Sequence, residues 1–247
     1  MTPEELKSEF YRLACTFYVS PGNERTYVVL SGLNENMPAA VQLFEKLLAD
    51  AQVNKEAYTN MTSDILKARS DAKLNQGQNF SRLMSFAMYG PKSPATNLLT
   101  EAELTNMNPQ ELVDRIHNQN SYKHRILYYG PSSSKDLLAT INQYHQVPAT
   151  LKDIPAGNEY AYLETPVTKV LVAPYDAKQI YMAQISNLDK KYDPAIEPIR
   201  ALYDEYFGGG MNSIVFQEMR ETRGLAYSAW ASIMPPSYLK YPYVLRT

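Results

Sequence analysis

The sequence predicts an α+β fold in which helices cover one face of antiparallel sheets. β-Branched and aromatic runs alternate apolar with polar residues and are joined by turns rich in proline and glycine, which is typical of paired strands. Between these runs lie longer segments with apolar residues at helical spacing, which indicates helices with one buried face. With 247 residues, 45% of them hydrophobic and 20% charged, the chain is large enough to bury a core.

The chain opens with a helix start and a hairpin. Residues 2–5 (Thr-Pro-Glu-Glu) supply a capping residue, a proline at the first helical position and a glutamate that can complete a capping box. The alternating run 10–20, a Pro-Gly-Asn turn and the run 25–33 predict an antiparallel hairpin. Cys15, the single cysteine, is expected to be a small buried residue, and it excludes an internal disulfide or a cysteine-based zinc site.

The rest of the first half alternates helical patterns with one further strand. Val41, Phe44 and Leu48 give one buried helical stripe. The residues that start and stop the remaining elements are capping boxes and Gly-Pro pairs. The predicted elements are helices at 34–48, 55–74, 78–89, from Thr100 and from Asn108, a strand at 122–129 and a helix at 132–145.

A change in composition divides the chain. Three prolines and a glycine interrupt residues 147–166, which are predicted to be a linker between a unit at 1–146 and a unit at 167–247. The strand–turn–strand pattern near the start of the chain is echoed near its end, which suggests two copies of a larger repeat. The second unit is expected to hold strands at 168–174 and 179–186, a helix ending at 207 with Ile199, Leu202, Tyr203 and Tyr206 facing inward, a helix from Asn212, and strands at 226–233 and 241–246.

Charge and motifs exclude several classes of function. A net charge of −2 argues against nucleic acid or an anionic membrane as partner. No run approaches the roughly 18 apolar residues of a membrane span and no signal peptide is recognisable in this segment, so a soluble chain of unknown compartment is expected. His117, His124 and His145 stand in no zinc-binding motif, so no metal is expected in this chain. No nucleophile elbow is present, and the glycine run 208–210 lacks the Lys-Ser/Thr of a phosphate loop.

The most informative stretch is 206–228. The three glycines at 208–210 are more than a helix C-cap requires and allow the backbone to approach a ligand or peptide, although a flexible turn is the simpler alternative. Asn212 and Ser213 can cap the next helix. Arg220 lies on that helix, and Tyr227 lies on the predicted strand after it. Taken alone, Arg220 would be interpreted as a solvated helix charge and Tyr227 as an ordinary tyrosine of a sheet. Together they indicate a device that holds a peptide or an oxyanion.

Residues 202–228 read Leu-Tyr-Asp-Glu-Tyr-Phe-Gly-Gly-Gly-Met-Asn-Ser-Ile-Val-Phe-Gln-Glu-Met-Arg-Glu-Thr-Arg-Gly-Leu-Ala-Tyr-Ser. This string resembles the C-terminal-repeat signature of the insulinase/pitrilysin family of zinc metallopeptidases. Residues 31–36 and 126–131 resemble the closing half of a preceding repeat. The resemblance implies metallohydrolase-like α+β repeats, with 1–146 the closing half of one repeat and 167–247 the truncated opening half of the C-terminal repeat.

The resemblance also implies roles for residues. Members of the family pair their repeats into two halves that close around a peptide. A late repeat contributes an arginine and, seven positions later, a tyrosine that bind the substrate and stabilise the tetrahedral intermediate. Arg220 and Tyr227 match these catalytic positions. The glycine-rich loop Gly208, Gly209 and Gly210, with Asn212 and Ser213, matches the loop beside the substrate path and is expected to bind substrate.

One family feature is missing. The zinc motif His-x-x-Glu-His does not occur, so the resemblance implies the non-zinc portion of a metalloendopeptidase, with zinc in a separate part of the parent protein and no activity in this chain alone. The expected partners are a peptide substrate and the zinc-bearing repeats. Chains are also expected to self-associate through an exposed sheet edge at the strand 241–246. The alternatives are a non-catalytic substrate-binding or scaffold subunit, and a purely structural repeat.

Overall fold

A computed structural model describes residues 2–22, 25–236 and 238–247. The chain forms two compact units: Met1–Asp64 with Thr100–Asn158, and Ile65–Leu99 with Glu159–Thr247. The crossing after Asn158 falls inside the expected linker. Residues 65–99, which the sequence groups with the N-terminal half, instead lie with the C-terminal unit, because the long helix α3 (Lys55–Lys73) runs from one unit into the other.

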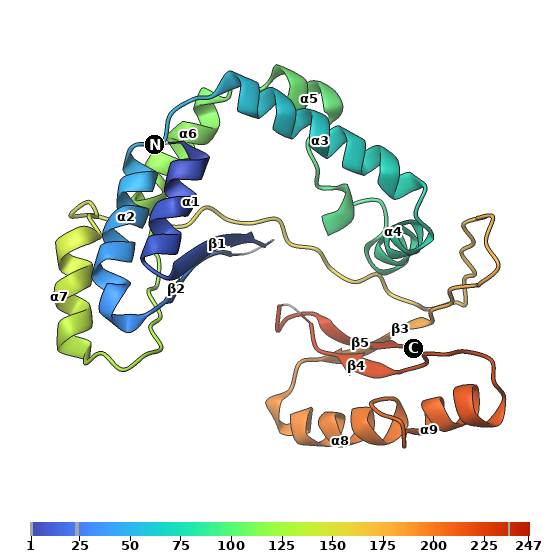
Figure 1. Cartoon of the computed structure of the whole chain (residues 1–247). Coiled ribbons are helices and arrows are strands. Elements are labelled where there is room, and N and C mark those ends of the chain that lie inside the picture. Colours follow the sequence, from blue (N-terminus) through green and yellow to red (C-terminus); the bar gives the residue numbers. More distant parts are fainter. Residues whose placement is uncertain (1, 23–24, 237) are drawn as a thin grey trace. The chain divides into compact units, whose positions relative to one another are not determined.

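The first unit is a β-hairpin packed with helices (Figure 1). Strands β1 (Cys15–Pro21) and β2 (Thr26–Gly32) pair antiparallel, with Cys15 opposite Gly32 and Pro21 opposite Thr26. Position 23 of the predicted turn lies outside the described residues. The helices of this unit are α1 (Pro3–Arg12), α2 (Met37–Ala49), the start of α3, α5 (Glu101–Asn106), α6 (Gln110–His117) and α7 (Ser134–Tyr144), with 3-10 turns at Asn34–Asn36 and Gln119–Ser121.

The core of the first unit joins α1 and α2 to the hairpin. Phe10, Cys15, Ala40 and Phe44 are buried together. The Phe17 ring lies 4.8 Å from the ring of Phe10 and 5.5 Å from that of Phe44, so three aromatic rings link two helices and a strand. Burying each such side chain stabilises the fold by about 1.5–3 kcal/mol. The predicted burial of Cys15 and Phe44 is therefore confirmed.

The second unit is a three-stranded antiparallel sheet with helices along one face (Figure 1). Strand order is β3 (Ile185–Lys191), β5 (Pro242–Arg246), β4 (Ser232–Met234). Val215, Ala231, Tyr243 and Val244 are buried in this unit. Its helical elements are the end of α3, α4 (Gln76–Tyr89), α8 (Glu197–Phe207), α9 (Ile214–Phe216), a π-helical segment (Gln217–Thr222) and 3-10 turns at Pro94–Thr96 and Pro194–Ile196.

Two predicted element starts are wrong. The run 10–20 is a strand only from Cys15, because the Thr2 capping box starts a helix that continues to Arg12, and Ala14, with φ of 49°, then turns the chain. The predicted box at Asn108 does not form. The N-cap of α6 is Pro109, and the Asn108 side chain accepts a hydrogen bond from Gln110 N at 3.1 Å.

Three predicted strands are absent or shortened within the described ranges. Residues 122–129 are not a strand, and their sole ladder contact is a parallel bridge between Tyr122 and Lys152. Residues 168–174 have no regular structure, and the strand expected at 179–186 begins at Ile185. A segment with strand propensity becomes a strand only when another strand forms backbone hydrogen bonds with it, and along most of their length these segments have no such partner.

The C-terminal unit corrects three further expectations. Ile199, Leu202 and Tyr206 are 67–72% exposed, because α8 turns its charged side chains, not this stripe, toward the sheet. The strand expected at 226–233 covers only Ser232–Met234. The last strand, β5, is the middle strand of its sheet, so the edges are β3 and β4 and the expected exposed edge at 241–246 is wrong.

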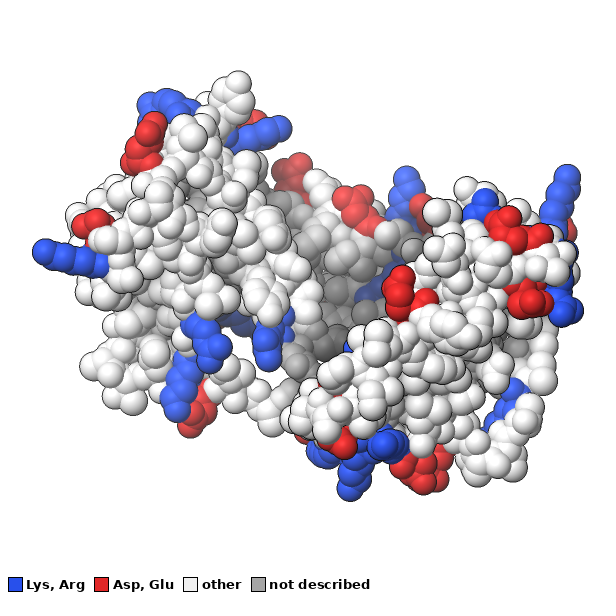
Figure 2. All heavy atoms as spheres, turned by 90° about the horizontal axis from the view of Figure 1, so that it is seen from below, with Lys and Arg blue, Asp and Glu red and all other residues white. Residues whose placement is uncertain are grey.

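The surface carries charges of both signs. On the face in Figure 2, basic and acidic residues are interspersed rather than gathered into one patch of a single sign. Among the described helices, none combines the length and apolarity that crossing a membrane demands.

Candidate functional site

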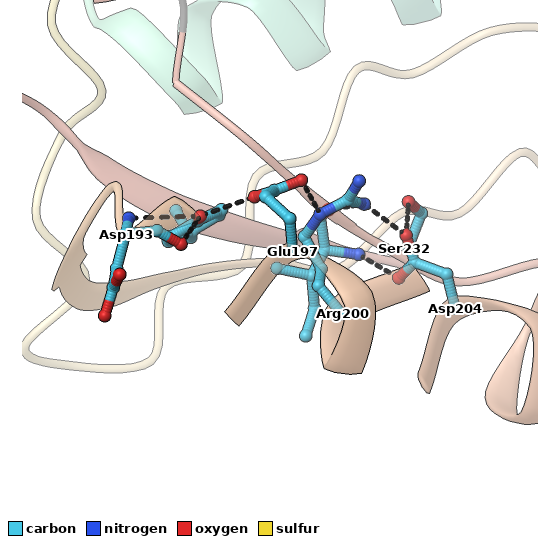
Figure 3. Close-up of polar contacts among 7 residues, drawn as sticks. Asp193, Glu197, Arg200, Asp204 and Ser232 are labelled. Carbon is cyan, nitrogen blue, oxygen red and sulfur yellow. Dashed lines mark hydrogen bonds and ion pairs between the residues drawn. The ribbon is translucent and has the colours of Figure 1, made fainter. Parts of the chain in front are cut away.

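The segment 206–228 is held in place by a charged network between α8 and β4 (Figure 3). Arg200 donates from Nη1 to Asp204 Oδ2 at 2.7 Å and to Ile233 O at 3.0 Å, and from Nε to Glu197 Oε2 at 3.0 Å. Asp204 also accepts from Ile233 N at 2.7 Å and from Ser232 Oγ at 3.0 Å. Since two of these bonds engage the backbone of Ile233, the network fixes β4 to the helix that leads into the glycines.

The network extends to the middle strand through a buried tyrosine. Tyr243, 1% exposed, donates its hydroxyl proton to Glu197 Oε1 at 2.6 Å. This hydrogen bond is the main cause that lowers the pKa of Glu197. Burial, and then the same bond to Glu197, raises the pKa of Tyr243. Both shifts favour a carboxylate beside a neutral phenol, which joins α8 to β5 as well as to β4.

The three glycines are not equivalent. Gly208 is buried, and a Cβ at this position would lie 2.2 Å from Ala231 N and 2.3 Å from Ala231 O, so only glycine fits this close approach. A Cβ on Gly209 would lie 2.9 Å from Asp204 O, whereas the nearest neighbour for one on Gly210 is Glu205 Oε1 at 3.4 Å. The backbone that approaches Gly208 is the chain's own, from the residue before β4.

The two candidate caps have different surroundings. Ser213 is 1% exposed, and its hydroxyl accepts from Phe216 N at 3.3 Å, so it is the N-cap of α9. Asn212 is exposed beside it and gives no cap bond. The helix cap predicted at Asn212 or Ser213 is therefore supplied by Ser213. The substrate contact expected of both residues stays a prediction, which the exposed Asn212 fits better than the buried Ser213.

Arg220 lies on the π-helical segment Gln217–Thr222, and the chain turns at Gly224, two residues after it. Gly224 has φ of 61°, a left-handed conformation that glycine adopts without strain. Its N–H donates to Arg220 O at 3.0 Å, and Leu225 N donates to Met219 O at 2.8 Å. These nested bonds resemble a Schellman motif in which each bond spans one residue more, as the wider π-helical turn requires. The reversal sends the chain back toward Arg220.

This reversal brings Arg220 and Tyr227 together. The guanidinium carbon of Arg220 lies 4.6 Å from the centre of the Tyr227 ring and 4.9 Å from that of the Phe216 ring. Its nearest acid is Glu221, with Nε and Oε1 3.5 Å apart, longer than a good hydrogen bond. Two aromatic rings therefore hold the guanidinium by cation–π contacts while its N–H groups stay without hydrogen-bond partners among the described residues.

Tyr227 is not on a strand, since β4 begins only at Ser232. The residue is 85% exposed, and within the described ranges its hydroxyl makes no hydrogen bond. Arg220 is less exposed, at 37% of its side chain. The pair therefore presents several N–H donors and one O–H donor to solvent from one short segment. An oxyanion or a peptide carbonyl is the kind of group that such donors bind.

A zinc ion does not fit the described residues. They contain no group of three or more His, Cys, Asp or Glu side chains arranged to hold a metal. The zinc chemistry that the resemblance implies has no ligands in this part of the chain, and these side chains support no step through a metal.

Sequence reasoning missed two parts of the site. Phe216 stands four residues before Arg220, and aromatic–cation pairs at this spacing share a helix face, so the spacing was the available signal. Glu197, Arg200 and Asp204 also have helical spacing, with charges of alternating sign. That pattern is typical of a solvated helix face, and only the position of β4 shows that it faces the sheet.

Similarity to known proteins is found in structure and not in sequence. No family model and no curated protein matches the sequence. Among solved structures, a protease from Helicobacter pylori superposes with a TM-score of 0.69 at 12% identity over 100% of this chain and 60% of that one. The peptidase M16 inactive domain from Pseudomonas fluorescens superposes with a TM-score of 0.65 at 16% identity, over 100% of this chain and 60% of that one. A ferredoxin protease solved in complex with an Arabidopsis ferredoxin superposes with a TM-score of 0.66 at 12% identity, over 99% of this chain and 26% of that one.

This chain thus spans about 60% of the length of two of these proteins and about a quarter of the third. Identities this low establish similarity of fold. The expected α+β class and the resemblance to insulinase-type peptidases are confirmed at that level. The chain has the α+β fold of M16 peptidase-like structures.

Proposed function

We propose that this chain is the non-zinc portion of an insulinase-type metalloendopeptidase and contributes substrate binding and transition-state stabilisation to peptide hydrolysis. The observation that carries the proposal is the placement of Arg220 between the rings of Phe216 and Tyr227, where its guanidinium makes no hydrogen bond in the described structure and its ion pair with Glu221 is 3.5 Å long. The M16-like fold and the resemblance of residues 202–228 to the signature of that family support the same assignment.

The chemistry follows from the donors. Hydrolysis of a peptide bond develops negative charge on the carbonyl oxygen as water adds to the carbon. The Arg220 guanidinium and the Tyr227 hydroxyl donate hydrogen bonds to that oxygen, and the bonds strengthen as charge develops. Two aromatic faces hold the guanidinium, and its ion pair with Glu221, at 3.5 Å between partly exposed side chains, is weak, so the positive charge remains available to a substrate. One such donor contributes about 10²–10³-fold in rate.

Other parts of a parent protein would supply the zinc ion, its ligands and the general base. The proposed partners are an extended peptide or protein substrate and the zinc-bearing repeats. The structurally similar ferredoxin protease was solved with a protein bound, which supports a protein-derived substrate. Gly209, Gly210 and Asn212 are the loop residues proposed to contact the substrate, whereas Gly208 and Ser213 shape the loop from within.

The test compares two peptides that differ at one bond. A fluorescein-labelled extended peptide and its analogue with a phosphinate in place of the central amide, which mimics the tetrahedral intermediate, are titrated against the full chain by fluorescence anisotropy. The phosphinate is expected to bind more tightly. Arg220→Ala is expected to weaken its binding about 10–100-fold, the loss of one or two charge-assisted hydrogen bonds. Equal phosphinate affinity for wild type and Arg220→Ala would contradict the proposal.

A matched control lies three residues away. Arg223 has the same charge on the same segment, but its guanidinium is 3.3 Å from Glu218 Oε2 and it contacts neither aromatic ring. Arg223→Ala should leave phosphinate binding within about twofold of wild type. An equal loss in both variants would indicate attraction by net charge only.

A non-catalytic substrate-binding subunit is the second candidate, because one of the similar structures is named an inactive domain. The same titration separates the two functions. A subunit that only binds peptide should hold the amide and the phosphinate with equal affinity, and Arg220→Ala should weaken both to the same extent.

A further inference from the structure

A second cluster of titratable side chains belongs to the first unit, whereas the segment 206–228 belongs to the second. His145, just after α7, places its Nε2 2.8 Å from the Nε2 of His124. The ring centres are 4.9 Å apart and the planes are at 87°, so the rings meet through their nitrogens rather than by stacking. His145 Nδ1 lies 2.7 Å from Glu45 Oε1 on α2, and His124 Nδ1 lies 2.7 Å from Tyr122 O.

Counting donors and acceptors fixes the number of protons on the pair. The carbonyl oxygen of Tyr122 can only accept, so His124 Nδ1 carries a hydrogen. The Glu45 carboxylate accepts, so His145 Nδ1 carries one as well. Both tautomers are then set, and without a further proton the two Nε2 lone pairs would face each other at 2.8 Å. The contact is a hydrogen bond only if a third proton lies between the rings.

One carboxylate, that of Glu45 on α2, faces the pair, and His124 itself is exposed. Glu45 and His145 are largely buried, with 18% and 13% of their side chains exposed, so their ion pair is poorly screened. Asn120 Nδ2 donates to the second Glu45 oxygen at 3.0 Å and holds the carboxylate in place. Lys46, His117 and Tyr144 line the adjacent cavity with Glu45. Near His124 lie Lys123, which pairs with Asp153 at 2.5 Å, Lys152, over the Tyr122 ring, and Arg125, next in sequence. The helices packed against α2 also carry Glu111, Asp114 and Arg115 on α6 and Lys135 and Asp136 on α7.

We propose that His124 and His145 share one proton and form a pH-sensitive clasp that fastens the C-terminal end of α7 to α2 within the first unit. The clasp is complete when the pair carries three ring protons. Adding a fourth proton places two imidazolium N–H groups against each other, and removing the third leaves two opposed lone pairs. The clasp should therefore loosen when the pair gains a proton and also when it loses one, and the range to measure is about pH 5–8, in which histidine side chains in general change charge.

The direct test is ¹⁵N-edited NMR of the histidine rings in the full chain across that pH range. Since the chain has three histidines, assignment needs only the single His→Gln variants. The expected result at mid-range is that His124 and His145 both hold a proton on Nδ1 and share one at Nε2. Two rings that titrate independently, or that change tautomer freely, would overturn the proposal.

The structural consequence is measured by hydrogen exchange in the last turn of α7, where the His145 N–H donates to Ile141 O. His124→Gln is expected to lower protection there about tenfold at mid-range pH, the loss of one charge-assisted bond, and to flatten its pH dependence. His117→Gln removes a histidine that lines the cavity beside Glu45, and it should change neither the protection of this turn nor its pH dependence. Wild-type protection retained in His124→Gln would overturn the clasp. So would a stoichiometric complex when the full chain is titrated with Zn²⁺, because the bridging cation would then be a metal and not a proton.

Discussion

Replacing Asp204 with asparagine tests the network that positions the candidate site. The Asp204 carboxylate accepts from the Arg200 guanidinium, the Ile233 N–H and the Ser232 hydroxyl. An asparagine of the same size keeps one acceptor oxygen and turns the other position into a donor. That NH₂ group then faces donors that need an acceptor, and Arg200 loses one of its two carboxylate partners.

The expected loss follows from the bonds involved. A hydrogen bond to a charged group contributes about 1.5–3 kcal/mol, and a buried donor left unsatisfied costs a further amount of about 1–3 kcal/mol. The retained oxygen still accepts one bond, and 18% of the Asp204 side chain is exposed, so water compensates in part. We expect Asp204→Asn to lower the free energy of unfolding by roughly 2–3 kcal/mol. With a slope m of about 2 kcal/mol/M for the free energy of unfolding in urea, the urea midpoint should fall by roughly 1–1.5 M.

The single tryptophan makes this measurement specific to the second unit. Trp230 stands two residues before β4, and the Arg246 guanidinium carbon lies 5.1 Å from its ring. Its fluorescence in urea should therefore report the unfolding of this sheet. Glu205→Gln is the matched control, since Glu205 is exposed on the same helix, and its midpoint should stay within roughly 0.3 M of wild type. An Asp204→Asn midpoint equal to that of Glu205→Gln would refute the reasoning.

Three further predictions use the same fluorescence assay. Gly208→Ala should lower the free energy of unfolding by about 3 kcal/mol, because its Cβ would lie 2.2 Å from the Ala231 backbone. Gly210→Ala, whose Cβ would lie 3.4 Å from the nearest atom, should lower it by less than about 1 kcal/mol. Equal urea midpoints for the two variants would exclude the close approach at Gly208. Gly224→Ala should cost about 1 kcal/mol, because φ is 61° there, and an unchanged midpoint would mean that the turn is not left-handed. Because the Tyr243 hydrogen bond lowers the pKa of Glu197, its stabilisation is present above the usual glutamate range and is lost as pH falls through the lowered value. Tyr243→Phe should therefore flatten the acid limb of the stability–pH profile, and an unaltered limb would contradict this assignment.

Local signals in the sequence predicted most helices well. The capping boxes at Thr2 and Thr100 form as expected, and of the stripe predicted for α2 Phe44 is buried while Val41 and Leu48 are half-buried. Such features depend on residues three or four apart, so one segment contains all the information. Strands depend on a partner from elsewhere in the chain, which explains the wrong predictions at 122–129 and 168–174.

The orientation of α8 shows the same limit on a helix. Its apolar residues Ile199, Leu202 and Tyr206 share one face, and hydrophobicity alone turns that face inward. The opposite face carries Arg200 and Asp204, which bond the β4 backbone as well as each other. Sequence patterns assign such charges to solvent, because the carbonyl and N–H groups that satisfy them belong to a strand about 30 residues later.

The structure separates two roles that the sequence places in one motif. Gly208 and Ser213 are buried and shape the loop: Gly208 leaves room for the Ala231 backbone, and Ser213 caps α9. Arg220 and Tyr227 face outward, with donors that make no hydrogen bond in the described chain, and the Arg220 Nε lies 3.5 Å from Glu221 Oε1. The buried residues are necessary for the outward ones, because the path from Gly208 to Ala231 encloses the π-helical turn and the reversal at Gly224. A change at Gly208 should therefore weaken phosphinate binding without touching the ligand, whereas a change at Arg220 should weaken binding and leave the urea midpoint nearly unchanged. Measuring both quantities for each variant distinguishes a residue that shapes the site from one that acts on the peptide.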